Sequence, residues 1–355
     1  MDDSENFSPW DRLADTALRI CAGASWLLLA LFFIAAFGMG RARADETACA
    51  GRDLIAEMAR TDPAGLQALR RQAAATVNGR GLLWKIEKPG VKPSYLYGTM
   101  HLTDPRVLKL SDAAETAYRA ADTVVIETEE VLDPKAPARV MAQSPELMMF
   151  MDDTTLEKLI PPESLDKVRA ELSSRGISLT AVNRMQPWML TSMLALPACE
   201  MTRKKQGIAF LDIKLAEDAR RVGKSIAGLE TIRDQLAAMA SLPVQFHIDG
   251  LIEALALGPK LTDIFETMTI LYLRGDTGMI FPLMRSVSAG NGDDGKNYAE
   301  FEEKMVNARN RTMAEHATPI IDRGNAFIAV GALHLPGEKG LVSLLKERDY
   351  MVTAQ

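Results

Sequence analysis

The chain has 355 residues, of which 47% are hydrophobic and 25% are charged, and its formal net charge is −6. This composition is typical of a globular protein with a sizeable core, and the length allows one large domain or two lobes. No basic stripe with interleaved aromatic residues is present, so nucleic acid is not expected among its partners.

The N-terminal region contains a long uncharged segment. Residues 20–40 carry no charged side chain, and their densest part reads "WLLLALFFIAAF". Twelve dense apolar residues are typical of a signal-peptide core, whereas the whole stretch is long enough to span a bilayer. Ala42, Arg43 and Ala44 then form an A-x-A cleavage pattern. We therefore predict that residues 1–44 are a signal peptide or a membrane anchor. The rest would be exported, either periplasmic or anchored and facing outside the cytoplasm, with membrane contact only through this segment.

The cysteines agree with export. Cys21 lies in the apolar segment, which leaves Cys49 and Cys199 as an even pair. An exported compartment permits disulfides, so we predict a bridge between these two residues. The alternative is two unrelated buried thiols.

The first half of residues 45–355 begins with helical, connecting sequence, in which Asp62 and Pro63 are typical of a helix start. The runs "LLWKIEK" and "SYLYG" flank "PGVKP", a pattern that predicts a β-hairpin. After His101, "SDAAETAYRAAD" is expected to be a helix capped by Ser111 or Asp112, and "TVVIETE" a buried strand that ends in acidic residues.

Residues of about 135–285 have a mainly helical pattern. Within them, "LDIKLAEDARRVGKSIAGLE" predicts an amphipathic helix and a short strand that ends at Glu230. The stretch 288–297 is a polar, glycine-rich loop, and a long helix follows it. The end of the chain reads as strand "NAFIAVG", helix "GLVSLLKERD" and strand "YMVTA". Together, these predicted helices and strands indicate one α/β domain over residues 45–355, with a central β-sheet surrounded by many helices.

One pattern occurs twice. "SYLYGTMHL" at 94–102 and "FIAVGALHL" at 327–335 each run from a strand through a glycine to a histidine three residues later. Ligands of open α/β sheets bind at the carboxyl ends of strands. We therefore expect two similar halves to meet at one cleft and bring His101 and His334 together, as metal ligands or as a general base with a partner. The alternative is two packing histidines at turns. The remaining histidines, His247 and His316, are expected to be structural.

Glu127 is the third candidate, because "TVVIETE" leads directly into it from a strand. Two histidines and a carboxylate are a ligand set for divalent metals that leaves positions open for water and substrate. The alternative is that Glu127, Glu129 and Glu130 form a solvated acidic rim. Glu230 is a similar acidic residue at a strand end, and the sequence gives less support for placing it in the site.

Arg309 is the fourth candidate. It belongs to a helical stripe spaced by four that is otherwise apolar: Phe301, Met305, Arg309 and Met313. A buried charge requires a partner, so Arg309 is either a structural ion pair or a cleft residue that orients a catalytic carboxylate or a substrate oxyanion. Asn310 is next to it, on a flank of the same helix.

These residues together resemble the TraB/PrgY/GumN family, which includes the Tiki proteases. The matching segments are "GLLWKIEKPGVKPSYLYGTMHLTDP", "TVVIETE", "GKSIAGLETIRDQLAAM", "ARNRTM" and "FIAVGALHLPGEKGLVSLLKERDY", over about residues 80–353. The resemblance implies an α/β core around a strand-end cleft, related to the erythromycin-esterase/ChaN-like superfamily, and a metal-dependent, membrane-tethered peptidase.

The resemblance also implies site residues. His101, His334 and Glu127 would bind a divalent metal ion, and Glu127 would act in catalysis together with Arg309 and Asn310, which match the family's "RN" pair. Where the family usually has Gly-x-Asp, "GIAFLDIKL" offers Asp212 after Phe210 and Leu211. This departure leaves the role of Asp212 open.

The sequence thus favours an exported metal-dependent hydrolase, a peptidase, acting on a peptide or small-molecule substrate. Its metal would polarise the carbonyl and activate a water. One alternative is a metal-independent, esterase-like hydrolase with His101 as general base beside Glu127. Another is a non-enzymatic ligand- or haem-binding envelope protein, with a histidine as axial ligand.

Overall fold

The computed structural model describes residues 49, 51–288 and 296–355, which belong to one compact unit. The apolar segment at 20–40, the cleavage pattern at 42–44 and most of the predicted loop at 288–297 lie outside these residues. In the described part of the chain, no helix is both long enough and apolar enough to cross a membrane.

A mixed six-stranded sheet runs through the described region in the order β4-β3-β5-β2-β1-β6. The strands are β1 (Leu83–Glu87), β2 (Ser94–Thr99), β3 (Thr123–Ile126), β4 (Ser225–Gly228), β5 (Ala326–Gly331) and β6 (Met351–Ala354). The predicted β1–β2 hairpin is antiparallel, as is β1 with β6, whereas β2, β5, β3 and β4 are parallel. The predicted α/β fold with a central sheet is therefore confirmed.

The two histidine units lie on neighbouring strands of this one sheet. β2 and β5 pair in parallel, with Gly98 opposite Val330 and Thr99 opposite Gly331. β3 pairs with the other side of β5, with Val125 opposite Ile328. Because the three strands are parallel, their carboxyl ends meet at the same edge of the sheet.

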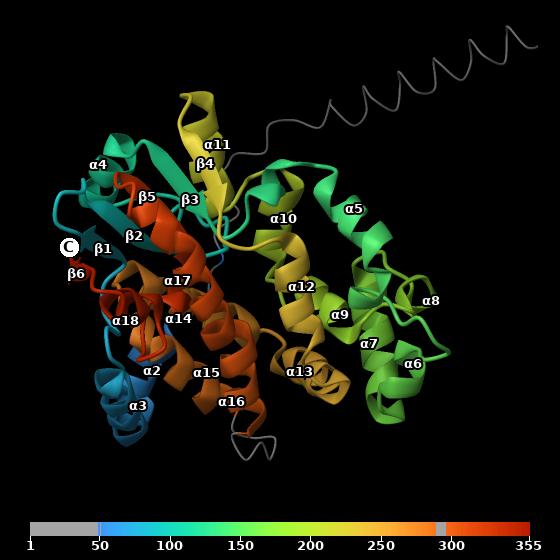
Figure 1. Cartoon of the computed structure of the whole chain (residues 1–355). Coiled ribbons are helices and arrows are strands. Elements are labelled where there is room, and N and C mark those ends of the chain that lie inside the picture. The colour runs from blue at the N-terminus through green and yellow to red at the C-terminus, as the bar shows by residue number, and fades with distance from the viewer. Residues whose placement is uncertain (1–48, 50, 289–295) are drawn as a thin grey trace, which may run out of the picture. The chain divides into compact units, whose positions relative to one another are not determined.

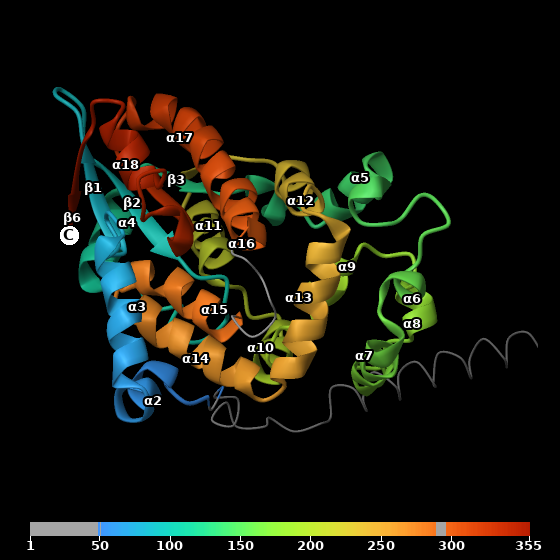
Figure 2. The same cartoon turned by 90° about the horizontal axis from the view of Figure 1, so that it is seen from below.

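Helices cover both faces of the sheet, which explains why the parallel strands are apolar on both sides. On one face lie α17 (Ala308–Ile321) and α18 (Leu341–Lys346) (Figures 1 and 2). They pack on side chains such as Ile328 and Val330. On the other face, α4 (Asp112–Ala120) and α11 (Leu211–Arg221) pack on side chains such as Val124 and Phe327. As predicted, Ser111 caps α4 by accepting a hydrogen bond from the N–H of Ala114.

The long helix before β5 is not regular throughout. α16 (Lys296–Glu302) continues through a π-helical segment, Glu303–Asn307, into α17. A π segment moves the residues before it out of phase with those after it, so Phe301 does not form one ideal stripe with Met313. Such segments are frequent at functional sites.

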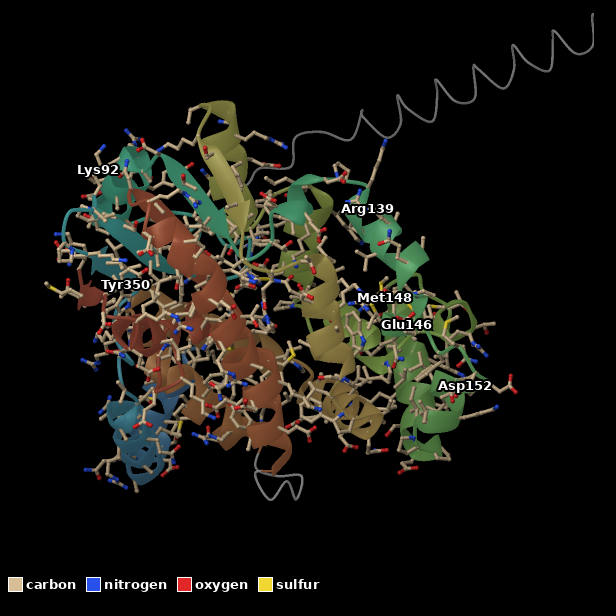
Figure 3. The ribbon with its side chains drawn as sticks, in the orientation of Figure 1. Lys92, Arg139, Glu146, Met148, Asp152 and Tyr350 are labelled. Carbon is tan, nitrogen blue, oxygen red and sulfur yellow. A yellow bond between two sulfur atoms is a disulfide. The ribbon has the colours of Figure 1, made fainter. Side chains whose placement is uncertain are left out.

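The middle of the chain forms a second cluster of helices beside the sheet. Its helices are α5 (Ala136–Gln143), α6 (Leu156–Leu159), α7 (Pro162–Ser174), α8 (Leu179–Val182), α9 (Pro187–Leu194), α10 (Ala198–Lys205), α12 (Ile232–Ala240) and α13 (Val244–Leu257). Side chains such as Leu172, Leu190 and Ile248 give this region a core of its own. Glu146, Met148 and Asp152 lie here, whereas Lys92 and Tyr350 lie by the sheet (Figure 3).

A third group of helices packs below the sheet in Figure 1: α2 (Leu54–Thr61), α3 (Pro63–Ala75), α14 (Lys260–Leu273) and α15 (Ile280–Ser288). Asp62 caps α3 and Pro63 opens it, as the sequence predicts. The predicted disulfide between Cys49 and Cys199 is confirmed, with their Cα atoms 5.6 Å apart. It fastens the segment before α2 to the start of α10.

Candidate active site

The carboxyl ends of β2, β3 and β5 bring three predicted residues together. His101 follows β2 by two residues, Glu127 directly follows β3, and His334 ends a short 3-10 turn after β5. The Nε2 atoms of His101 and His334 lie 4.0 and 3.8 Å from Glu127 Oε1. The alternative of a solvated rim fits the exposed Glu129 but not Glu127, which is 6% exposed.

Glu127 is held by partners at both oxygens. Its Oε1 accepts a hydrogen bond of 2.7 Å from the N–H of Gly331. Its Oε2 accepts from Arg309 Nη2 at 2.8 Å and from Gln235 Nε2 at 3.0 Å. These contacts fix the carboxylate so that Oε1 is directed toward the two imidazoles.

Arg309 combines the two roles that the sequence left open. Its Nη2 also donates to Glu230 Oε2 at 2.6 Å, and its Nε donates to both Glu230 oxygens at 3.1 Å. The partly buried guanidinium therefore forms a structural ion pair with Glu230 and, at the same time, orients Glu127. β4 ends at Gly228, two residues before Glu230, and not at Glu230 as the sequence predicted. The chain turns there because the N–H groups of Leu229 and Glu230 donate to Glu127 O.

Asn310 contacts a histidine and not Glu127. Its Oδ1 lies 2.7 Å from His334 Nδ1, and its Nδ2 donates to Lys339 O at 2.9 Å. Since an amide oxygen only accepts, Nδ1 of His334 carries the hydrogen and Nε2 keeps its lone pair. Asn310 is thus a positioning residue that selects the tautomer of His334.

Asp212, whose role the sequence left open, lies within the cluster. Its Oδ1 is 3.5 Å from His101 Nε2 and accepts a 2.7 Å hydrogen bond from Thr99 Oγ1. Its buried Oδ2 has no hydrogen-bond partner. Phe210, two residues earlier, packs against the His101 ring with their centroids 4.9 Å apart. A single sequence gave no signal for the Thr99 contact, because β2 and α11 are far apart along the chain.

A buried network holds the loop after His101. The N–H and Oγ1 of Thr103 donate to Glu200 Oε2 at 2.9 and 2.7 Å. Arg203 pairs with Glu200, and its Nη2 also lies 3.3 Å from Cys49 Sγ. The disulfide at Cys199 therefore adjoins the residues that position the first histidine unit. Sequence reasoning missed Glu200 and Arg203, although Glu200 directly follows a predicted disulfide cysteine.

The environment sets opposite pKa shifts at the two histidines. Burial lowers the pKa of His334 to about 4 even beside Glu127, so this ring is neutral at pH 7. Partial desolvation by the surrounding protein also acts to lower the pKa of His101, but Asp212 and Glu127 outweigh it and raise the value to about 9. Burial alone would raise the pKa of Glu127, yet His334, His101, Arg309 and the Gly331 N–H lower it to about 2. Because His334 is neutral at pH 7, Arg309 and His101 provide the stabilising charge there.

The imidazole nitrogens and carboxylate oxygens of this site are of the chemical types that bind divalent cations. Donors that share a zinc-like ion lie roughly 3–4 Å apart, given metal–ligand bonds of about 2.0–2.2 Å. The Nε2 lone pair of His334 and the unpartnered Oδ2 of Asp212 are available, and two carboxylates, Glu127 and Glu230, face the guanidinium of Arg309. The donors are not already arranged as a metal-binding site. Over residues 49, 51–288 and 296–355, no group of three or more His, Cys, Asp and Glu side chains is spaced to hold an ion.

A partly apolar cavity of about 260 Å³ opens onto this cluster. His101, Glu127, Arg309 and His334 are among the residues that line it. The two other histidines lie apart from it and bond to main-chain carbonyls: His247 to Met239 O at 3.0 Å and His316 to Leu229 O at 2.6 Å.

Parallel strands that gather imidazoles and a buried carboxylate at adjacent strand ends, beside a cavity, define an α/β protein with a strand-end site. The chain belongs to the TraB/PrgY/gumN family, whose model matches residues 82–354. The resemblance noted from the sequence is thereby confirmed. No solved structure matches the chain significantly.

Curated relatives include animal proteins named metalloproteases. Metalloprotease TIKI2 of Danio rerio is 22% identical over 318 residues, which are 76% of this chain and 60% of that protein. Metalloprotease TIKI1 of Danio rerio is 24% identical over 315 residues, or 76% of this chain and 62% of that protein. Metalloprotease TIKI1 of Xenopus tropicalis is 22% identical over 345 residues, or 81% and 65%. The match to each of the three therefore spans less than two thirds of that relative's length.

Proposed function

We propose that the chain is a metal-dependent peptidase whose site lies at the carboxyl ends of β2, β3 and β5. The observation that carries the proposal is the convergence of His101 Nε2 and His334 Nε2 on Glu127 Oε1, within 4.0 and 3.8 Å. The names of the relatives support the same class of activity.

His101, His334 and Glu127 would hold the ion, and Asp212 is close enough to His101 to take part. When bound, a divalent ion polarises the scissile carbonyl and lowers the pKa of a bound water. The identity of the ion is left open by this donor set, because imidazole and carboxylate ligands suit several divalent metals.

The other residues act on these donors. Asn310 fixes His334 with its Nε2 lone pair toward the cleft, because a hydrogen bond at the other ring nitrogen orients a metal-binding histidine. Arg309 and Gly331 fix both oxygens of Glu127. The cavity beside them would seat the peptide and keep bulk water away from the reacting bond.

The proposal is tested by elemental analysis and peptide cleavage on the full chain. Wild-type protein is stripped with chelator and reloaded with Zn²⁺, Mn²⁺ or Co²⁺ separately, beside His101→Ala and His334→Ala. His316→Ala is the matched control, because this exposed histidine bonds to a main-chain carbonyl. We expect the first two variants to lose both metal and activity, and the control to keep both.

One outcome would favour a metal-independent hydrolase. If chelated wild-type protein cleaves peptides or esters at its full rate, His101 acts as a general base beside Glu127. The observation that favours this second candidate is that the donors do not form a finished cage in the described part of the chain.

Export is part of the same proposal. Residues 1–44 would direct the chain across a membrane, so that the α/β domain of residues 45–355 works in the periplasm or as an anchored domain outside the cytoplasm. The Cys49–Cys199 disulfide supports an oxidising compartment. N-terminal sequencing of the natural protein should find a start near Asp45, or an intact anchor in the membrane fraction. Full-length protein dissolved in the cytoplasm would contradict it.

A further inference from the structure

The cavity beside His101, Glu127, Arg309 and His334 is lined by two chemically different sets of residues. One set consists of the charged and polar residues described above. The other set is a wall of apolar side chains contributed by α14, α15, α16, the π segment and the turn after β5: Met268, Ile280, Phe301, Met305, Val306 and Leu333. We call this wall the apolar pocket.

Several of these side chains remain partly open to the cavity. Met268, Phe301, Met305 and Leu333 are only half-buried, although they are large and apolar. A partly exposed apolar wall inside a concave site is typical of ligand pockets, in which a few polar groups fix the orientation of the ligand.

The size of the cavity fits one large side chain. An apolar cavity of about 150 Å³ is known to hold benzene. A cavity of about 260 Å³ therefore has room for a Leu, Met or Phe side chain together with the peptide group that follows it.

The site disfavours the binding of ionised substrate side chains against the apolar wall. Among the described residues that line the cavity, the ionisable ones are His101, Glu127, Arg309, His334 and Tyr272. The phenol of Tyr272 donates its hydrogen to Gly98 O. Arg309 is already paired with Glu230 and Glu127. An acidic or basic substrate side chain at the wall would lose its hydration without gaining a partner.

The wall is linked mechanically to the reacting groups. Met305 and Val306 belong to the π segment, and Arg309 Nη1 donates to Met305 O at 3.3 Å. The same guanidinium holds Glu127. A side chain seated against Met305 is therefore placed at a fixed position relative to the carboxylate.

We propose that the apolar pocket binds a large, uncharged apolar side chain of a peptide substrate next to the scissile bond, and that it tolerates Leu, Met and Phe. The tolerance follows from Met268 and Met305, because methionine side chains adapt to partners of different shape. The inference rests on the proposed peptidase function and names the substrate class of that same site.

The first test compares cleavage of peptides that differ at one position, occupied by Leu, Phe, Ala or Asp. A single methylene in an apolar pocket changes kcat/KM by about 10–200-fold, so we expect Leu and Phe to exceed Ala by at least about tenfold, and Asp to be the poorest. Met268→Lys should lower kcat/KM for the Leu peptide and raise it for the Asp peptide. Met141→Lys, at an exposed methionine of α5, is the matched control and should leave both values unchanged.

The second test does not depend on cleavage. Full-length protein labelled at methionine methyl groups is titrated with N-acetyl-leucinamide and with N-acetyl-aspartate amide, and methyl NMR signals are assigned by Met→Leu variants. We expect the signals of Met268 and Met305 to shift with the leucine compound alone, and the signal of Met141 to stay in place.

The two tests separate the possible failures. Shifted methyl signals without cleavage of any peptide would support the pocket and contradict the peptidase. Cleavage without side-chain preference and without methyl shifts would overturn the pocket and leave the peptidase in place. Neither cleavage nor shifts would overturn both.

Discussion

His101 and His334 each stand three residues after a glycine in one of the last two positions of a strand, yet the side chain of the first is 52% exposed and that of the second 7%. His101 faces Asp212 and Glu127, which raise its pKa to about 9, whereas burial lowers the pKa of His334 to about 4. Asn310 fixes His334, while a loop tied to Glu200 and the disulfide carries His101. The same local pattern thus yields one charged, accessible imidazole and one neutral, buried imidazole.

The largest expected effect comes from removing either imidazole. His101→Ala and His334→Ala should each lower the rate of peptide cleavage by about 10²–10⁴-fold, the usual contribution of a positioned catalytic group. They should differ in stability. His334→Ala leaves Asn310 Oδ1 buried without its partner, so its free energy of unfolding should fall by about 1–3 kcal/mol.

His101→Ala should lower the free energy of unfolding by less than His334→Ala in the same urea titration, because the ring is half exposed and water screens its interaction with Asp212 and Glu127. Equal destabilisation by His101→Ala and His334→Ala would contradict the difference in burial between the two histidines. His316→Ala serves as the control for both measurements.

The Cys49–Cys199 disulfide should affect the position of His101 more than that of His334. Replacing both Cys49 and Cys199 by serine should lower the free energy of unfolding by about 2–4 kcal/mol. Because Glu200 and Arg203 lie beside the bridge and hold Thr103, the ring signals of His101 in an NMR spectrum should move, while those of His334 stay. Cys21→Ser is the control. Movement of the His334 signals alone would refute this coupling.

The two histidines should also give the metal-free protein opposite slopes of stability with pH. A histidine in the unfolded chain has a pKa near 6.5, above the value of about 4 for folded His334. Between these values the unfolded state binds more protons, so stability should fall by up to about 3 kcal/mol as pH drops from 6.5 to 4.

For His101 the sign is reversed. Its folded pKa of about 9 lies above the unfolded value, so its contribution is complete below pH 6.5 and is lost as pH rises toward 9. The effect should be smaller than that of His334, because water screens the half-exposed ring. Urea titrations at several pH values should show the alkaline slope vanish in His101→Gln and the acid slope vanish in His334→Gln. Retention of either slope would contradict the assignment.

The smallest expected effect distinguishes the two glycines. A Cβ at Gly98 would lie 3.1 Å from the Cα and Cβ of Ala332, whereas one at Gly331 would lie 3.1 Å from Glu127 Oε1. Main-chain atoms cannot move aside as a carboxylate can. Gly98→Ala should therefore cost about 1 kcal/mol of stability through overpacking.

Gly331→Ala should cost less stability but lower the rate of cleavage, because it displaces the carboxylate. Thermal unfolding and peptide cleavage measured on both variants test this. A Gly331→Ala protein with full activity would show that the position of Glu127 Oε1 is not critical.

Much of the fold follows from local patterns. The apolar runs around "PGVKP" form the β1–β2 hairpin, Ser111 caps α4, and "TVVI" is a buried strand that ends before Glu127. These predictions succeeded because turn chemistry, capping and strand patterns act over a few residues. The π segment at Glu303–Asn307 was missed, since an extra residue within a helical turn leaves no distinct sequence pattern.

By itself, the sequence determined that His101, Glu127 and His334 would follow strands, and that Arg309 would need a carboxylate or a ligand as its partner. Only the tertiary structure decided that β2, β5 and β3 are neighbours, that Glu230 is the second partner of Arg309, and that Asp212 stands beside His101. It also decided which imidazole is charged. The physical reason is that a strand end depends on neighbouring residues, whereas a pKa depends on burial and charge contributed by segments far apart in the chain.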